Sequence, residues 1–443
     1  MVYYFELQKA FFMECEEEPQ SQAPKQLKRS LGLWSATAIN VGAIIGGGIF
    51  VVTGIVAGQA GSALIVSMAI AAVIALFTAL SFTELSSWQP VEGSAYEYIR
   101  QLVSPFAGFL SGWMWVVSNT FGGAAVSLGF AFYFHAAVPG LPMNMVAAVL
   151  CLGFTALNYF GVRQSALLNN VLVVVKLMVL AFFVIFGLFF VKSGNFAPFE
   201  PLSAGVFFGA FFIFFAYGGF ARATIVAEEV KDANRNVPRA VLFSLLISTA
   251  VYILVGVIAV GLVGANGLAG SSSPLATAME VSGNLPAVQL VSAGGLVATA
   301  SVLLTAILGV SRMMFSMSRR NDLPKALSKI DEKRRTPYVS VWSVGIAMTF
   351  LVLFVDLTSV VAISTFALLF WYIFANLAAF RLKADNRLYP RFLPIIGLVF
   401  CLVLFVIAAF VASAAWLTGV VFLAVGCVFY VLRNRQRILQ EKS

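Results

Sequence analysis

The sequence predicts an all-α integral membrane protein with twelve transmembrane helices. Of its 443 residues, 60% are hydrophobic and only 11% are charged, so a soluble fold would lack the polar residues to cover its surface. Charged and Pro/Gly-rich breaks divide the chain into twelve apolar stretches of about 17 to 30 residues, the length that a helix needs to cross a bilayer. The stretches lack the polar and apolar alternation of a transmembrane β-barrel.

Each predicted span is placed by its apolar run. The spans begin near Leu33, Ser62, Pro105, Met143, Ala166, Leu202, Val237, Ala287, Tyr338, Thr358, Phe392 and Ala412. Little chain remains between them, so no soluble domain is expected. Residues 1–27 carry an acidic run and a Gln/Pro/Ser-rich end and lack the features of a signal peptide, which predicts a disordered cytoplasmic tail.

The basic residues predict the orientation. With the N-terminus inside, almost all Lys and Arg residues between the spans fall in inside loops, and the outside loops hold only Lys192. The positive-inside rule then places both termini in the cytoplasm of a multi-pass cell-membrane protein. The net charge of +9 follows from this topology, and no nucleic-acid partner is expected.

Cysteine and histidine are too few and too scattered to predict a metal centre. Cys15, Cys151, Cys401 and Cys427 show no paired spacing, and His135 is the only histidine. We therefore expect no metal and no cofactor. Because no cluster of polar catalytic groups is present either, we expect that the protein is not an enzyme.

The first span contains three consecutive glycines, in the segment NVGAIIGGGIF. Each glycine in mid-helix costs roughly 1 kcal/mol relative to alanine. Gly46, Gly47 and Gly48 therefore indicate either a functional break in the helix or a place where another helix packs closely. Taken alone, the segment favours neither.

The sixth span is interrupted in the same way, by Gly218 and Gly219 in the segment FFIFFAYGGFARATIVAEEV. The two interruptions fall in the first span of successive groups of five, a pattern typical of transporters built from inverted repeats. Unwound backbone in a membrane needs protein or a water-filled cavity around it. Its free N–H groups suit a carboxylate and its free carbonyls suit a cation, so the paired breaks favour a binding site for a zwitterion.

Lys176 lies in the middle of the fifth span, too far from either end for its ammonium group to reach the interface. A buried lysine without an acidic partner releases its proton more readily than a lysine in water. We therefore expect Lys176 to lie beside the first break and to couple proton movement to transport, with a fixed structural charge as the alternative. Ser301 and Thr305 of the eighth span offer hydroxyl groups near it, unless they bond to their own helix.

Further charges are expected at the sixth span. Arg222 follows the second break and either lines the cavity or pairs with Glu84 of the second span; pairing is favoured because Glu84 has no other evident partner. Glu228 and Glu229 end the sixth span, where they either form an intracellular gate with nearby basic residues or are solvated.

Five motifs resemble those of the amino acid, polyamine and organocation (APC) superfamily. They are GAIIGGGIF, ELSSWQPVEGSAYEYIRQLVSPFAGFLSGW, NYFGVRQSALLNNVLVVVKL, FFAYGGFARATIVAEEVKDANRNVPRA and SRMMFSMSRRNDLP, in the family's order between residues 31 and 387. The resemblance implies a LeuT-type 5+5 inverted repeat with alternating access around spans one and six. The first repeat would cover residues 28–192, the second 193–387, and two extra helices 388–443.

The resemblance also implies a site. Family members bind the substrate carboxylate at the first break and its ammonium group on carbonyls at the second, with an aromatic ring that closes the site at the position of Phe215. The matching positions at the two breaks are Ile44, Gly46, Gly47, Gly48, Phe215, Ala216, Gly218 and Gly219.

A fifth-helix lysine replaces sodium in proton-coupled family members, and Lys176 matches it, with Ser301 nearby. Two departures prevent a transfer of substrates. Ala221 and Arg222 stand where many relatives have an acidic and a small residue, and Gly47 replaces a small hydroxyl-bearing residue. The sequence thus predicts a secondary active amino-acid transporter, with proton symport favoured, an exchanger as the alternative, and a non-transporting amino-acid sensor as a weaker one.

Overall fold

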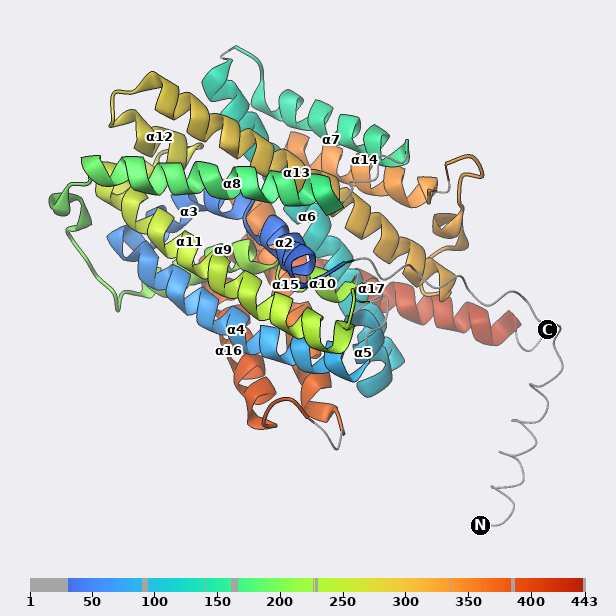
Figure 1. Ribbon diagram of the computed structural model, residues 1–443. Coiled ribbons are helices and arrows are strands. Elements are labelled where there is room, and N and C mark those ends of the chain that lie inside the picture. Colours follow the sequence, from blue (N-terminus) through green and yellow to red (C-terminus); the bar gives the residue numbers. More distant parts are fainter. Residues whose placement is uncertain are drawn as a thin grey trace.

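The computed structural model shows an all-helical protein (Figure 1). It describes residues 31–89, 95–138, 140–160, 166–225, 227, 230–334, 336–383 and 387–440. The expectations for the N-terminal tail and for Glu228 and Glu229 lie outside these residues. Within them the only β-type pairing is an isolated bridge between Leu31 and Val230.

The helices follow the predicted apolar stretches. The α-helices are α2 (Leu33–Ile44), α3 (Thr53–Ala60), α4 (Leu64–Trp88), α5 (Ala95–Leu102), α6 (Pro105–Ala137), α7 (Met143–Tyr159), α8 (Ala166–Gly187), α9 (Ala204–Tyr217), α10 (Arg222–Ile225), α11 (Ala233–Ala269), α12 (Pro274–Glu280), α13 (Leu285–Arg319), α14 (Tyr338–Phe354), α15 (Leu357–Arg381), α16 (Phe392–Val411) and α17 (Ser413–Gln440). Shorter turns are η1 (Gly48–Val52), η2 (Gly61–Ala63), η3 (Leu188–Phe190), η4 (Ser193–Phe196) and η6 (Lys325–Ser328). Each predicted stretch coincides with one helix or with a broken pair.

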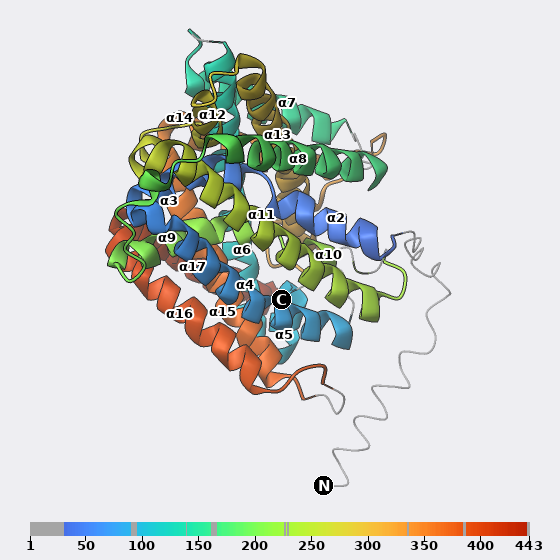
Figure 2. The same ribbon diagram turned by 60° about the vertical axis from the view of Figure 1, so that its left-hand side comes forward.

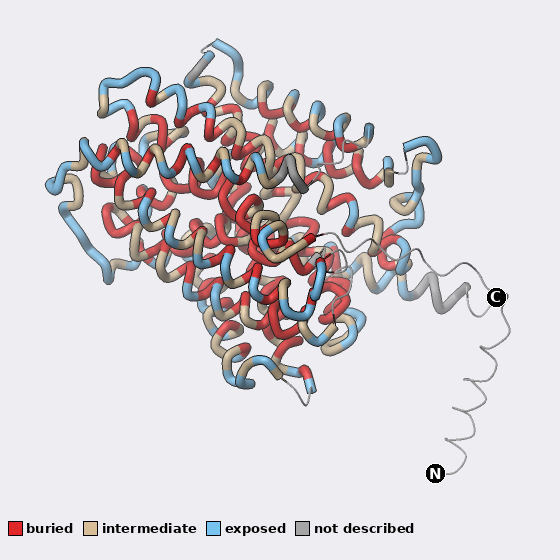
Figure 3. The backbone as a smooth tube through the Cα atoms, viewed as in Figure 1, coloured by how far each residue is buried: buried red, intermediate tan, exposed pale blue. Residues whose placement is uncertain are grey.

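Helix length and surface composition show a multi-pass membrane protein. In the described part of the chain, nine helical runs are long and apolar enough to cross a bilayer. One run, Leu33–Trp88, contains the first two predicted spans, and the shorter apolar helices α7 and α14 match the fourth and the ninth. Buried residues gather inside the bundle (Figure 3), while large apolar side chains such as Phe189, Phe410 and Val421 are exposed on its outside. Such a surface suits lipid.

Helix α6 lies inside the bundle and packs against α7, α13, α14 and α15. Helix α2 packs against α8 and α11, and α9 packs against α3 and α4. Helix α16 packs against α15, α4 and α9, and α17 packs against α15, α6 and α16. This arrangement places the two interrupted spans next to the central helix.

The first span is broken, as predicted. Helix α2 ends at Ile44, and Ile45 takes an extended conformation with φ −77° and ψ 92°. The helix resumes at Gly48 as the π-helical turn η1, which continues into α3; Figure 2 shows α2 and α3 as separate segments. The glycines also allow close packing, because a Cβ at Gly48 would overlap Ala216 of α9. The segment is therefore both a break in the helix and a place of close packing, and the function of the break stays a prediction.

The second break lies directly against the first. Helix α9 ends at Tyr217, turns follow through Ala221, and α10 is only four residues long. A Cβ at Gly219 would lie 2.5 Å from the carbonyl carbon of Ala43 in α2. Only glycine permits two backbones to approach this closely.

Helix α11 begins earlier than the predicted start of the seventh span. Asp232, with a φ of 46°, precedes its first turn, and Pro238 lies inside the helix. Because proline has no N–H group, the carbonyl of Asn234 lacks its usual helical donor. The hydroxyl of Ser87 in α4 donates to this carbonyl at 3.4 Å instead. The helix thus begins at Ala233, before the predicted start at Val237, with Pro238 inside it.

Candidate functional site: a cavity between two broken helices

A cavity of about 540 Å³, counted with its open mouth, lies between the two breaks. Helices α6, α13 and α15 complete its wall. It is lined by Ala43, Ile44, Gly47, Gly48, Ser118, Asn119, Gly122, Gly123, Val126, Phe215, Ala216, Gly218, Gly219, Arg222, Val302, Ala306, Ser364 and Leu368.

Most of the predicted binding positions meet in this cavity. Those that line it are Ile44, Gly47, Gly48, Phe215, Ala216, Gly218 and Gly219. Gly46 is absent from the lining, because it faces α13, where a Cβ would overlap Val302. The ring of Phe215 reaches across to α6, close enough to lie 3.3 Å from a Cβ built at Gly122.

Buried tyrosines bind the carbonyl groups that the breaks leave without helical donors. The hydroxyl of Tyr252 donates to Ile44 O at 2.7 Å and also lies 3.1 Å from Ala216 O. Tyr372 donates to Gly218 O at 3.2 Å. The sequence reasoning missed these residues, although a tyrosine in an apolar span signals that its hydroxyl needs a partner inside the protein.

Asn40 links the two interrupted spans below the cavity. Its side-chain oxygen accepts a hydrogen bond of 2.6 Å from the backbone N–H of Ala223, at the start of α10. This N–H belongs to the first turn of a helix and has no partner within it. Asn40 was not singled out from the sequence, although an asparagine in mid-span was the available signal.

A pair of serines joins α6 to α15 at the cavity wall. Ser118 donates to the carbonyl of Ser364 at 2.9 Å, and Ser364 donates to the carbonyl of Ser118 at 2.7 Å. These reciprocal bonds use both hydroxyl protons. The serines therefore fix the wall on this side of the cavity and offer oxygen acceptors to it.

Lys176 lies beside the first break. Its side chain on α8 is 2% exposed, and its Nζ donates to the carbonyl of Gly42 at 3.2 Å. Gly42 lies in the last turn of α2, where the helix presents its negative end. Among the described residues, no carboxylate lies within 4 Å of this ammonium group.

The hydroxyl groups of Ser301 and Thr305 donate hydrogen bonds to carbonyl groups of their own helix, α13. Ser301 donates to Ala298 O at 3.1 Å, and Thr305 donates to Val302 O at 2.9 Å. This is the alternative that the sequence left open for them. Neither residue lines the cavity.

Arg222 lines the cavity and does not pair with Glu84, so the favoured pairing is wrong. Its Nη2 donates to the side-chain oxygen of Asn119 in α6 at 2.6 Å. Its guanidinium carbon lies 5.5 Å from the ring centre of Trp115, which is a cation–π contact. Asn119, which accepts this hydrogen bond, lies about a hundred positions earlier in the chain, and no local sequence pattern predicts the contact.

Glu84 has other partners. Its carboxylate lies 3.5 Å from Arg387 Nε and accepts hydrogen bonds from the N–H groups of Leu388 and Tyr389. It lies near the end of α4 and holds the segment between α15 and α16. It does not line the cavity.

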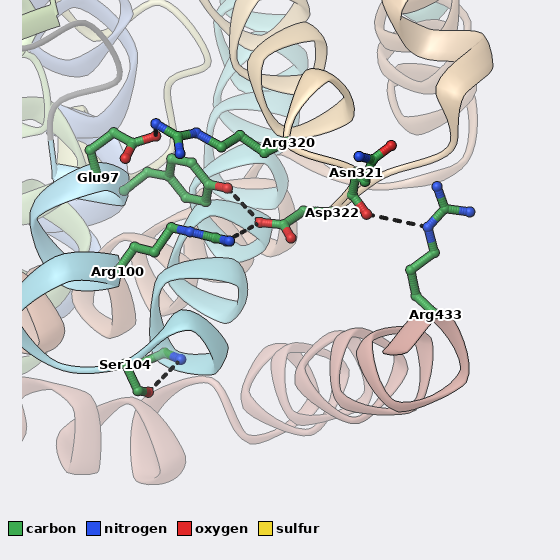
Figure 4. A network of polar contacts seen from close by, with 9 residues as sticks. Glu97, Arg100, Ser104, Arg320, Asn321, Asp322 and Arg433 are labelled. Atoms are coloured by element: carbon green, nitrogen blue, oxygen red, sulfur yellow. Dashed lines mark hydrogen bonds and ion pairs between the residues drawn. The ribbon is translucent and has the colours of Figure 1, made fainter. Parts of the chain in front are cut away.

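A polar network at one end of the bundle joins α5 to the segment after α13 (Figure 4). Arg100 forms an ion pair with Asp322 at 2.8 Å, and the hydroxyl of Tyr96 donates to the same carboxylate. Arg320 forms a second ion pair with Glu97 at 2.9 Å. The network is buried on the α5 side, where Tyr96 and Glu97 are inaccessible.

The chemistry of this network depends on its protonation. Burial first, and then the neighbouring Asp322 carboxylate, raises the pKa of Tyr96, which therefore stays a neutral donor. Burial opposes the charge of Arg100, but the attraction of Asp322 leaves its pKa raised. Asn321, with a φ of 59°, turns the chain here, and its carbonyl accepts a hydrogen bond from Arg433 of α17 at 3.3 Å.

Comparison with known proteins agrees with this architecture. The amino acid permease family model matches residues 31–432. The chain is 31% identical to the branched-chain amino acid permease BcaP of Bacillus subtilis, over 93% of this chain and 94% of that protein. It is 29% identical to the methylthioribose transporter of Bacillus subtilis, over 94% and 96%. It is also 29% identical to the vacuolar cationic amino acid transporter 4 of Arabidopsis thaliana, over 78% and 62%. The chain belongs to the amino acid permease family of the APC superfamily.

Proposed function

We propose that this protein is a secondary active amino-acid transporter of the cell membrane. It works by alternating access in a LeuT-type fold of twelve transmembrane helices. The repeats cover residues 28–192 and 193–387, two further helices follow, and both termini lie in the cytoplasm. The observation that carries the proposal is the cavity between two breaks at corresponding positions of the repeats. The family membership and the similarity to a branched-chain amino acid permease support an amino-acid substrate.

The two breaks supply the groups that a zwitterion needs. The N–H groups at Gly47 and Gly48 begin a new helical segment without a preceding turn, and they bind the carboxylate. The carbonyls of Phe215, Ala216 and Gly218 bind the ammonium group. Tyrosine hydroxyls already contact two of these carbonyls, but each carbonyl oxygen has a second lone pair for the substrate. The ring of Phe215 covers the bound molecule.

Proton coupling runs through Lys176. The protonated side chain donates to Gly42 O and places a positive charge at the negative end of α2. Loss of the proton removes this stabilisation and frees α2 to move at the break. Because α2 ends in the substrate cavity, the proton and the substrate bias the same element, which is the differential interaction that coupling requires.

The test is uptake of labelled leucine into proteoliposomes that contain the purified protein, with the membrane potential clamped. An inward proton gradient drives accumulation above equilibrium, and a sodium gradient alone does not. Lys176→Met abolishes gradient-driven accumulation but retains exchange of internal for external leucine. The matched control is Lys192→Met, which removes the exposed lysine of the η4 segment and leaves accumulation intact.

Four outcomes count against the proposal. Full pH-driven accumulation by Lys176→Met would contradict the role of that lysine. Uptake that requires a preloaded amino acid and ignores the proton gradient would make the protein an exchanger. Recovery of chemically altered leucine would show that the protein is an enzyme. If no amino acid of a tested panel entered the proteoliposomes, the protein would not be an amino-acid transporter.

A further inference from the structure

Arg222 is held rigidly at the edge of the cavity. Its Nη2 donates to Asn119, and its guanidinium plane lies over Trp115. Its Nη1 occupies the space that Gly309 of α13 leaves open, since a Cβ at Gly309 would lie 2.7 Å from it. The amide of Asn119 is itself fixed, because its NH₂ group donates to Trp115 O at 3.0 Å. Contacts from α6 and α13 therefore fix the position of this charge.

Among the described residues, no carboxylate pairs with Arg222. The ion pairs found among the described residues involve Asp322, Glu97 and Glu84, and none of these includes Arg222. The part of the chain that the structure describes contributes no acidic residue to the cavity lining, whose other polar side chains belong to Ser118, Asn119 and Ser364. All of these are uncharged, so the cavity carries a fixed positive charge.

From this arrangement we propose that Arg222 is a specificity-determining residue that excludes amino acids with cationic side chains. The inference rests on the proposed transport function and deepens it: the substrates have neutral or anionic side chains. Two like charges held a few ångströms apart in this cavity repel each other, which disfavours the binding of a second cation. The sequence similarity to a cationic amino acid transporter therefore does not extend to its substrate.

The test compares substrates that differ in charge and little in shape. Lysine and norleucine compete with labelled leucine for uptake into proteoliposomes, and citrulline and arginine form a second pair. In the wild-type protein, norleucine competes at least about tenfold better than lysine, since each tenfold step corresponds to only 1.4 kcal/mol. Arg222→Met narrows this ratio by about tenfold, whereas Arg222→Lys keeps the charge and keeps the ratio.

A second variant leaves Arg222 in place. Asn119→Asp is nearly isosteric and sets a carboxylate 2.6 Å from the guanidinium, which cancels the charge of the cavity. Like Arg222→Met, Asn119→Asp reduces the factor by which norleucine competes better than lysine. A merely structural role for Arg222 would change the affinity for both competitors equally and leave their ratio as it was. The same ratios are measured as ligand-induced thermal stabilisation of the purified variants if transport is lost.

Two results would overturn the inference. One is a wild-type protein that binds lysine as well as norleucine. The other is an unchanged ratio in both Arg222→Met and Asn119→Asp. Failure of the proposed transport function would give another result. In that case no amino acid, norleucine included, would enter the proteoliposomes or stabilise the wild-type protein.

Discussion

The hydroxyl group of Tyr252 contacts a carbonyl group in each of the two broken spans. It lies between Ile44 O and Ala216 O, the terminal carbonyls of two helices that are far apart in sequence. Because the group is fully buried, water does not replace it. A buried carbonyl without a donor costs about 1 to 3 kcal/mol.

Tyr252→Phe therefore lowers both the thermal stability of the purified protein and its affinity for leucine, the latter by about tenfold. The affinity falls because the carbonyl of Ala216 is no longer held at the cavity. Uptake kinetics and thermal unfolding in detergent measure the two effects. Tyr217→Phe is the control, since its hydroxyl donates to Met68 O, away from the cavity.

The control loses stability but keeps the wild-type KM for leucine. Equal KM values for Tyr252→Phe and the wild-type protein would show that the hydroxyl does not position the site.

Single residues were predictable when their local context was unusual. A lysine in mid-span must be buried, so the burial of Lys176 was predictable from the sequence. The partner of Arg222 was not, because Asn119 lies on another helix and an asparagine in α6 has many possible uses. Glu84 shows the same limit, since its partner Arg387 lies in a loop some 300 positions away.

Among the elements, α2 and α9 show that a glycine break and close packing occur together. Gly219 lies against the backbone of Ala43, which cannot move aside as a flexible side chain does. At the break, some carbonyl groups lose the N–H groups that would donate to them in a continuous helix. The close packing brings other donors of the protein near these carbonyl groups. A break and close packing looked like alternatives for the glycines only while each helix was considered separately.

Gly219→Ala places a methyl group 2.5 Å from the Ala43 carbonyl carbon and forces α2 and α9 apart. Overpacking of this kind costs about 1 to 3 kcal/mol. We expect lower thermal stability and a loss of leucine uptake of at least about tenfold. Gly153→Ala in α7 is the matched control, because a Cβ there meets no atom within 4 Å.

Gly153→Ala keeps its uptake and is as stable as the wild-type protein or slightly more so, since alanine favours a helix over glycine by roughly 1 kcal/mol. Normal uptake by Gly219→Ala would refute the close contact between the two breaks.

The positions of the helices were largely predictable, and their ends were less so. Apolar length placed α4, α8 and α16 within a few residues, because the bilayer sets the length of a span. The start of α11 was placed at Val237 instead of Ala233, because a proline is expected in the first turn of a helix and Pro238 lies further inside. The short helix α5 lies within a motif but has no apolar run to reveal it.

Across the whole molecule, the network around Asp322 ties together segments from distant parts of the chain. It joins α5, the end of α13 and, through Asn321, the last helix α17. The sequence predicted the all-helical membrane class from composition alone. It did not predict this association, because the charged residues at helix ends look like solvated loop residues until the fold brings them together.

Asp322→Asn destabilises the protein, because it leaves the partly buried Arg100 without its counter-charge. The cost is about 1 to 3 kcal/mol, less than for a fully buried pair since Arg100 remains partly exposed. Lys325→Gln is the control, because this exposed lysine forms no ion pair among the described residues, and single surface charges contribute about 0 to 1 kcal/mol. Thermal unfolding of the purified variants should rank them in this order.

The pH dependence of Tyr96 provides a second measurement on the same network. Its folded pKa is raised, so its contribution is complete below the ordinary tyrosine pKa of about 10 and disappears as the pH rises through the higher folded value. The stability advantage of the wild-type protein over Tyr96→Phe is therefore constant near neutral pH and shrinks above about pH 10. An advantage that falls between pH 6 and 8 would contradict this assignment.

The contact of Gly219 with Ala43 has a mechanical consequence. The backbones of the two interrupted spans touch with no side chain between them, and Asn40 and Tyr252 tie them together on either side of that point. Neither span has room to slide past the other there. In the alternating-access cycle that we propose, this contact would be a pivot, about which the half-helices swing together, so that closing the cavity on one side of the membrane opens it on the other.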